Sequence, residues 1–195
     1  MIYTIGHSNH PIERFIALLR QHEITAVADV RSTPYSRFNP QFNRETLRKS
    51  LVDAGIHYVY LGEELGARSK DRSCYDDGRV NYYKLAQTGL FKRGLERLRT
   101  GMAEHKIALM CAEKEPLECH RTILVTRELV SQGIPVTHIL DSGAIESHDA
   151  AVARLRERLD IPAEDLFRSQ AELIEAAYDL QGRTIAYVEP ATNHR

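Results

Sequence analysis

Short apolar runs alternate with amphipathic segments along most of the chain. Five runs have the length and composition of buried strands, namely residues 2–6, 24–30, 56–62, 106–111 and 135–140. Apolar positions recur at helical spacing in the segments between them, 11–22, 44–54, 82–102 and 121–133. Alternating strands and helices are typical of a parallel sheet covered on both faces. We therefore expect a three-layer α/β fold with a mostly parallel, five-stranded sheet.

The polar segment 62–81 interrupts this alternation. Connections of that length in a compact domain are usually functional or mobile. We expect it to close over a site as a lid that carries Arg68, Lys70, Arg72, Cys74 and Tyr75. The helical pattern that follows is interrupted near Thr88-Gly89.

The end of the chain has a different pattern. Residues 147–195 contain two amphipathic helices split around Ile161-Pro162 and a short strand-like piece, with no candidate chemistry of their own. The expected organisation is an α/β domain over residues 1–146 and a helical C-terminal extension over 147–195. The extension would pack on this domain or on a partner subunit, in the second case as a homodimer.

Composition narrows the class of protein further. The 195 residues fit one domain. The net charge of −1 gives no global basic excess that would indicate nucleic acid, but it does not exclude local basic patches. No apolar run has the length of a membrane span, and "MIYTIGHSNH" lacks the features of a signal peptide. We expect a cytoplasmic protein without membrane contact, in which the three cysteines are reduced.

Reactive and polar residues follow the predicted strands. Ligands of open parallel sheets bind beyond the carboxyl ends of the strands, so these residues should meet at one rim. They are His7, Ser8 and Asn9 after the first strand, Asp29, Arg31, Ser32 and Arg37 after the second, and Cys111, Glu113, Cys119, His120 and Arg121 after the fourth. This convergence predicts a binding site more strongly than any single residue does.

Asp29 and Arg31 are separated by one residue at a strand end, so their side chains point the same way. Asp29 would orient the guanidinium of Arg31 to hold a phosphate or carboxylate. The alternative is an ion pair that only braces the loop. Nearby aromatic residues would offer faces on which a base can stack: Tyr35, Phe38 and Phe42.

The stretch "IALMCAEKEPLECHRTILV" (107–125) allows three interpretations. The first is a zinc or iron site formed by Cys111, Cys119 and His120. The spacing of the two cysteines is unusual for such a site, and adjacent residues such as Cys119 and His120 seldom point at one ion, so we assign no metal. A thiol nucleophile would resemble the layout of rhodaneses and cysteine phosphatases, although those families keep five residues between Cys and Arg. The third is that Cys111 is a core residue.

Four blocks together resemble a known family. They are "TIGHSNHPIERFIALL", "VADVRSTPYSRFNPQF", "YLGEELGA" and "LMCAEKEPLECHRTILVTRELVSQGIPVTHIL". In this order, over residues 2–142, they are similar to the bacterial and archaeal proteins grouped as domain of unknown function 488. The resemblance implies no activity. It implies that the family signature consists of four blocks: His7-Ser8-Asn9, Asp29-Val30-Arg31-Ser32 with Pro34, Leu61-Gly62 with Leu65-Gly66, and Cys111 and Glu113 with Cys119-His120-Arg121.

We expect a rim pocket that binds an anionic substrate, either a small-molecule nucleotide or a nucleic acid. Arg31 and Arg121 would hold the anion, with Ser8, Asn9, Asp29, Ser32 and Arg37 beside them, and the catalytic candidates are His7, Cys111, Glu113 and His120. Two alternatives stay open. One is a nucleic-acid-binding or regulatory module without catalysis, and the other is a thiol or metal-dependent enzyme.

Overall fold

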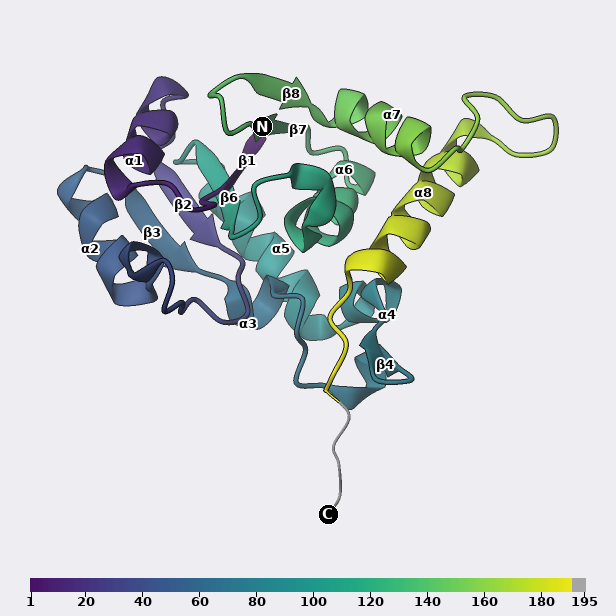
Figure 1. The fold of residues 1–195 in the computed structure, drawn as a ribbon, viewed down its shortest axis with the longest axis horizontal. Coiled ribbons are helices and arrows are strands. Elements are labelled where there is room, and N and C mark those ends of the chain that lie inside the picture. Colours follow the sequence, from purple (N-terminus) through teal and green to yellow (C-terminus); the bar gives the residue numbers. More distant parts are fainter. Residues whose placement is uncertain (191–195) are drawn as a thin grey trace, which may run out of the picture.

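The computed structural model describes residues 1–190 and is built around one six-stranded sheet (Figure 1). The strands of this sheet are β1 (Ile2–Gly6), β2 (Ala26–Asp29), β3 (His57–Tyr60), β6 (Ile107–Cys111), β7 (Val136–Ile139) and β8 (Ile145–Ser147). Their order is β3-β2-β6-β1-β7-β8, and the first five are parallel. The predicted α/β class and mostly parallel sheet are confirmed.

The predicted number of strands is wrong by one. β8 pairs antiparallel with β7, with Ile139 opposite Ile145, after a turn in which Gly143 has a φ of +92°. The strand has only three residues and is largely exposed, so it shows no apolar run in the sequence.

Helices cover both faces of the sheet. They are α1 (Ile12–Gln21), α2 (Arg44–Asp53), α3 (Gly62–Leu65), α4 (Tyr82–Gln87), α5 (Gly89–Gly101), α6 (Arg127–Ser131), α7 (His148–Arg158) and α8 (Gln170–Ile185). The predicted break between α4 and α5 is confirmed, because Thr88 caps α5 by accepting a hydrogen bond from the amide of Phe91.

Successive side chains of β6 point to opposite faces of the sheet and belong to two different layers of the core. Ala108 and Met110 lie with residues of α1 and α2 in one apolar cluster. Ile107, Leu109 and Cys111 belong to a second cluster that includes residues of α4, α5, α6, α7 and α8. Successive strand side chains point to opposite faces, so a strand that is buried on both faces reads as one apolar run.

The first turns of the predicted helix 121–133 are π-helical rather than α-helical. Segment η4 (Arg121–Thr126) has this wider form, and the Thr126 hydroxyl donates a 2.8 Å hydrogen bond to the carbonyl of Arg121. Short π-helical segments frequently occur at functional sites. This one begins directly after Cys119 and His120.

The polar segment 62–81 has secondary structure of its own. After α3 it forms a 3₁₀ turn, η2 (Arg72–Cys74), and a hairpin of β4 (Tyr75–Asp76) and β5 (Arg79–Val80). Cys74 is buried and Arg72 is paired with Glu189. Of the residues expected in the lid, only Arg68 reaches the rim pocket described below.

The C-terminal residues join the same structure. Ala151 and Leu155 of α7 and Ala177 and Tyr178 of α8 lie in the apolar cluster of the sheet. Beyond α8, Val188 bridges to β5 as the predicted strand-like piece, and residues 191–195 of the expected extension lie outside the described residues. No helix within residues 1–190 is long and apolar enough to cross a membrane.

The topology creates a crevice between β2 and β6. The chain leaves β2 through α2, on the face shared with α1, and leaves β6 through η4 and α6, on the opposite face. Where the connections of two adjacent parallel strands leave to opposite faces, a crevice opens outside their carboxyl ends. β2 and β6 are hydrogen-bonded neighbours, with Asp29 opposite Met110.

Candidate functional site

An ion pair lies at the carboxyl end of β2. Arg31 donates from Nε to Oδ1 of Asp29 at 2.9 Å and from Nη2 to Oδ2 at 2.7 Å. Nη2 also donates to the carbonyl of Phe42 at 2.9 Å, and Tyr58 donates its hydroxyl to Oδ2 of Asp29 at 2.8 Å. Both members of the pair are buried. This bidentate geometry fixes the plane of the guanidinium.

His7 accepts a further hydrogen bond from this guanidinium. Nη1 of Arg31 lies 3.1 Å from Nε2 of His7, and Nδ1 of His7 donates to the carbonyl of Ser8 at 2.8 Å. Burial, followed by the charge of Arg31, lowers the pKa of His7 from 6.5 to about 4. His7 is therefore a neutral imidazole that positions Arg31, and neither ring nitrogen is left for acid–base work.

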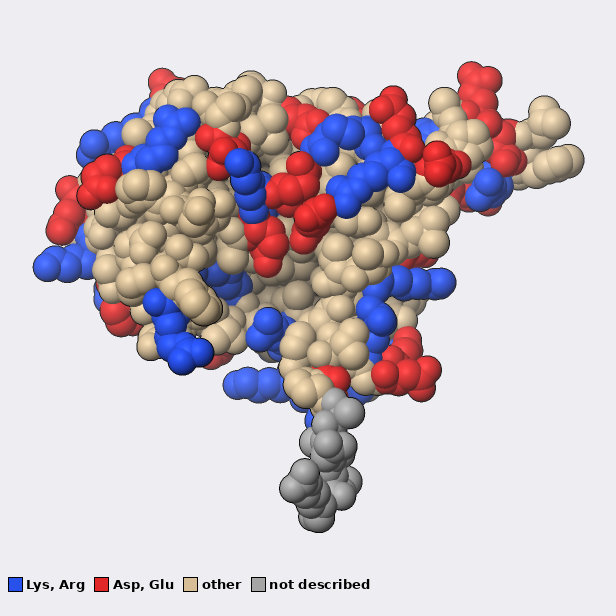
Figure 2. Space-filling view, viewed as in Figure 1, with Lys and Arg blue, Asp and Glu red and all other residues tan. Residues whose placement is uncertain are grey.

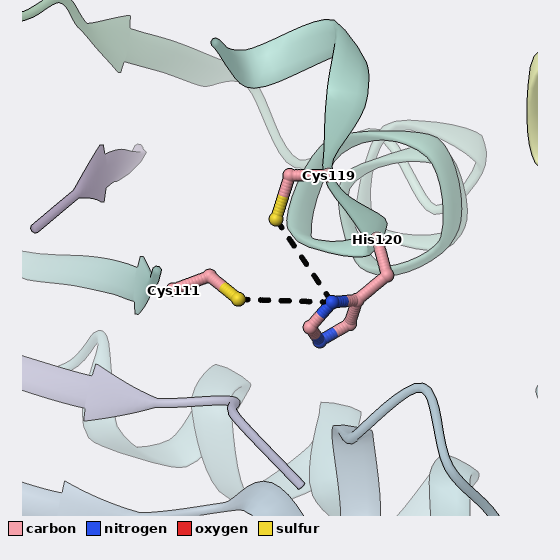
Figure 3. A group of neighbouring side chains, drawn as sticks. All are labelled: Cys111, Cys119 and His120. Carbon is pink, nitrogen blue, oxygen red and sulfur yellow. Dashed lines mark hydrogen bonds between the residues drawn. The ribbon is translucent and has the colours of Figure 1, made fainter. Parts of the chain in front are cut away.

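Two sulfurs and one imidazole nitrogen face one another at the carboxyl end of β6 (Figure 3). Sγ of Cys111 lies 3.7 Å from Nδ1 of His120, and Sγ of Cys119 lies 3.9 Å from the same nitrogen. The Glu113 carboxyl adjoins the group, with Oε2 3.0 Å from Sγ of Cys119. The three side chains of the cluster are buried.

The backbone explains how two adjacent residues join this cluster. Cys119 is extended, with φ −134° and ψ 139°, whereas His120 is helical, with φ −60° and ψ −24°. This change of conformation turns both side chains to the same side, contrary to the expectation that neighbours diverge. His120 Nε2 donates to the Val30 carbonyl at 2.9 Å, which leaves Nδ1 unprotonated in the neutral ring.

The two thiols differ in acidity. Burial raises the pKa of Cys111. Burial also disfavours a Cys119 thiolate, but the hydrogen bond from Cys111 and the charge of Arg121 outweigh it and lower the pKa of Cys119. The backbone amide of Arg121 lies 3.4 Å from Sγ of Cys119 and further stabilises a thiolate. Cys119 is therefore the more acidic of the two thiols.

The guanidinium of Arg121 faces the backbone of the loop after β6 and does not line the rim pocket. Its side chain is 0% exposed, and it donates from Nη1 to the carbonyl of Glu113 at 2.6 Å and from Nη2 to that of Lys114 at 3.2 Å. The expectation that Arg121 holds an anion is therefore corrected. Arg121 braces the loop after β6 instead.

A pocket of about 390 Å³ opens between the ion pair and the sulfur cluster. Its size is within the usual range for small-molecule sites. Reactive or charged residues of its lining are Arg31, Arg68, Cys111, Glu113, Glu118 and His120, and its aromatic residues are Tyr35, Tyr82 and Tyr187. Four of the five N–H groups of Arg31 have the partners given above, so within residues 1–190 one N–H on Nη1 has no partner.

Comparison with protein families gives one match. A family model described as Domain of unknown function DUF488 matches residues 11–127. The chain belongs to this family. Neither the comparison with curated proteins nor the comparison with solved structures gives a match.

The DUF488 match includes most of the rim residues, and the structure brings many of them together. Arg31, Ser32, Cys111, Glu113 and His120 line one pocket, with Asp29 directly behind Arg31. The other predicted residues do not line it: His7, Ser8, Asn9, Arg37 and Arg121. Arg37 is exposed, and Phe42 stacks on His7 with ring centroids 4.2 Å apart, so Phe42 is not free to stack on a base.

Two aromatic residues of the site were not predicted from the sequence. Tyr82 begins α4, and Tyr187 lies beyond α8 and outside the DUF488 match. Tyr187 reaches the pocket because residues 187–189 pair with the hairpin, through the amide of Val80 and the carbonyl of Tyr187 at 2.9 Å. No local motif signals this long-range pairing.

Proposed function

We propose that the rim pocket binds a nucleotide or the end of a nucleic acid through its phosphate, and that the protein acts on it as an enzyme. The observation that carries this proposal is that Arg31, fixed by Asp29 and His7, lines one pocket with Cys111, Glu113 and His120. A guanidinium fixed by a carboxylate is a preorganised phosphate site.

The balance of charge in the pocket permits an anion. Glu118 is paired with Arg158 at 2.6 Å, and the Glu113 carboxyl contacts Sγ of Cys119. Burial, together with Cys119, raises the pKa of Glu113, which favours its neutral form. Arg68 is an exposed cation in the pocket lining, and its charge is not offset by any of these contacts.

The surroundings favour a small or terminal ligand over a long duplex. Acidic and basic side chains are interleaved on the face shown in Figure 2, rather than gathered in one basic patch. Extended nucleic-acid surfaces rely on many phosphate contacts from Lys and Arg. Tyr35 and Tyr187 offer aromatic faces for one base at the pocket itself.

Among the catalytic candidates, Glu113 is the best placed for acid–base work. His120 donates Nε2 to a backbone carbonyl and turns Nδ1 to the sulfurs, while His7 is fully engaged with Arg31. A thiol mechanism is less favoured, because Cys111 is the cysteine that lines the pocket and burial raises the pKa of its thiol. Glu113 would exchange a proton with the substrate or with water.

Equilibrium binding to the full chain tests this proposal. Fluorescence anisotropy with a labelled short oligonucleotide, competed by nucleoside monophosphates, should show salt-dependent binding. Arg68→Ala should weaken it by about 10-fold or more, the usual loss for one charged hydrogen bond. Arg20→Ala is the matched control, since Arg20 lies in the last turn of α1 and contacts the carbonyl of Ala54.

Two further variants separate catalysis from binding alone. Glu113→Gln should retain binding but lose turnover of a nucleotide panel analysed by mass spectrometry. If wild-type protein binds without turnover and Arg37→Ala abolishes binding, the protein is a binding module that uses an exposed surface. Equal affinities of wild type and Arg68→Ala would contradict the proposed pocket.

A further inference from the structure

We propose that Cys111, Cys119 and His120 bind one Zn²⁺ ion, with the fourth coordination position open to the rim pocket beside Glu113. The site shares the pocket of the proposed function. It is argued from the geometry of its own residues, and its test measures metal rather than activity.

The separations of the three ligand atoms match a tetrahedral zinc site. With bonds of about 2.3 Å to sulfur and 2.05 Å to nitrogen, tetrahedral angles place sulfur and nitrogen about 3.6 Å apart. The observed distances from His120 Nδ1 are 3.7 Å to Cys111 and 3.9 Å to Cys119, and all three atoms lie within 4.8 Å of one another. Little movement is needed to admit the ion.

Hydrogen bonds explain this convergence only in part, because the other contacts of Cys119 Sγ, with Oε2 of Glu113 and the amide of Arg121, do not involve His120. The unprotonated Nδ1 of a neutral imidazole has one lone pair, which accepts one hydrogen. Two sulfurs nevertheless face this single nitrogen, as Figure 3 shows. A metal ion at their common centre would satisfy both sulfurs and the nitrogen at once.

The surroundings have the outer contacts that zinc ligands usually need. The carbonyl of Val30 accepts the other ring N–H of His120 at 2.9 Å, which fixes the ring and aims Nδ1 at the sulfurs. Such a contact typically accompanies a metal-bound histidine. The backbone amide of Arg121, 3.4 Å from Sγ of Cys119, would donate to a metal-bound thiolate. The ligands are only 3% (Cys111), 1% (Cys119) and 8% (His120) exposed.

The choice of zinc follows from the ligand types. Two thiolates and one imidazole form a soft donor set that suits zinc in tetrahedral geometry. Two thiolates also balance the charge of Zn²⁺, so the buried centre is neutral.

The open position follows from the pocket lining. Cys111 and His120 line the pocket, whereas Cys119 is not part of its lining. Three protein ligands with an open fourth position are typical of catalytic rather than structural zinc. Glu113 lines the same pocket and adjoins the cluster, so it would lie near a water or a substrate oxygen at that position.

Metal titration of the full wild-type chain decides the proposal. Reduced protein, stripped with a chelator and reloaded, should hold one Zn²⁺ per chain by elemental analysis. Cobalt in its place should give the visible bands of a tetrahedral site and a thiolate-to-cobalt charge-transfer band. A wild-type protein that holds no stoichiometric metal, or that binds cobalt without the thiolate band, would overturn the site.

Variants assign the ligands. Cys111→Ser, Cys119→Ser and His120→Asn should each weaken Zn²⁺ binding by more than about 100-fold in competition with a chromophoric chelator, beyond the usual loss for an outer contact. Cys74→Ser, at the third buried cysteine, is the matched control and should bind as wild type does. Wild-type affinity in all three ligand variants would refute the assignment.

A variant of Glu113 tests whether the fourth coordination position is open. Glu113→Gln should keep one Zn²⁺ per chain and the tetrahedral cobalt spectrum, because Glu113 lies beside the open position and is not a ligand. Loss of the metal in this variant would show a closed, four-ligand site and overturn the open position. A wild-type protein that holds one Zn²⁺ per chain but binds no nucleotide would contradict the proposed function and leave the zinc site intact.

Discussion

Asp29 and Arg31 form two parallel hydrogen bonds, 2.9 and 2.7 Å long, in a buried position at the end of β2. The pair also binds Tyr58 on one side and His7 on the other. The guanidinium therefore keeps one orientation before any ligand arrives. Removal of either charge would leave the other buried without its partner.

Asp29→Asn should destabilise the protein by about 3 to 5 kcal/mol, the usual result of breaking a buried ion pair by removing one member. The change is nearly isosteric, so lost packing contributes little. Urea unfolding followed by circular dichroism measures the effect. Glu45→Gln is the control, because its pair with Arg44 is exposed and 3.9 Å long, and its effect should be below about 1 kcal/mol. Similar effects of the two variants would count against a tightly coupled pair.

Acid should weaken the contact between the C-terminal helices and the sheet. The buried chain of hydrogen bonds runs from Thr4 to His138 at 2.8 Å, on to His148 at 3.1 Å and to Tyr178 at 2.5 Å. Burial lowers the pKa of His138 to about 3 and that of His148 to about 4, from 6.5. The unfolded chain takes up these protons first, so stability present above pH 6.5 is lost as the pH falls towards 4.

For His148 alone, this shift corresponds to about 2 kcal/mol of stability lost between pH 7 and pH 5. Urea unfolding at a series of pH values measures the dependence. His148→Gln should flatten the curve while lowering stability at pH 7. A curve with the same slope in both proteins would show that His148 is not the titrating group.

Gly6→Ala should disturb the loop that holds the sulfur cluster. A β-carbon at Gly6 would lie 1.9 Å from the carbonyl oxygen of Glu113, the same oxygen that accepts from Arg121. We expect a loss of about 1 to 3 kcal/mol, as for other overpacked sites. Gly89→Ala is the control, since its β-carbon would meet only a side-chain nitrogen of Arg93, at 3.6 Å. Thermal unfolding that places both variants at the wild-type midpoint would rule out this tight approach.

Tyr187 should contribute to nucleotide binding although it lies outside the DUF488 match. It lines the pocket and stacks against Arg68, whose Cζ is 4.6 Å from the ring centroid. Tyr187→Ala should weaken binding by about 5-fold or more, as for loss of one base stack. Tyr187→Phe should bind nearly as wild type does, and so should Val188→Ala, its neighbour in the same backbone pairing. Equal affinities of Tyr187→Ala and Val188→Ala would exclude a stacking role.

The positions of the parallel strands could be predicted from the sequence, and so could the rim where Arg31, Cys111 and His120 meet. Both follow from one-dimensional patterns, since apolar runs mark buried strands and parallel strands end at the same edge. β8 was missed because three largely exposed residues carry no such pattern. The π-helical form of residues 121–126 was missed for a related reason, because its apolar spacing resembles that of an α-helix.

The direction of individual side chains could not be predicted in this way. Arg121 follows directly after two residues of the cluster, yet its guanidinium turns back to the carbonyls of residues 113 and 114. Cys119 and His120 share one side because the backbone changes from extended to helical between them. Tyr187 reaches the pocket through pairing with residues more than 100 positions earlier in the chain. These relationships depend on tertiary contacts that no local pattern records.

A crystal structure of the protein soaked with a nucleoside 5′-monophosphate tests the central claim most directly. We expect the phosphate within hydrogen-bond distance of Nη1 of Arg31 and of the guanidinium of Arg68, with the base beside Tyr35 or Tyr187. A nucleotide bound elsewhere, or an empty and solvent-accessible pocket at saturating nucleotide, would contradict the claim that this rim is the binding site.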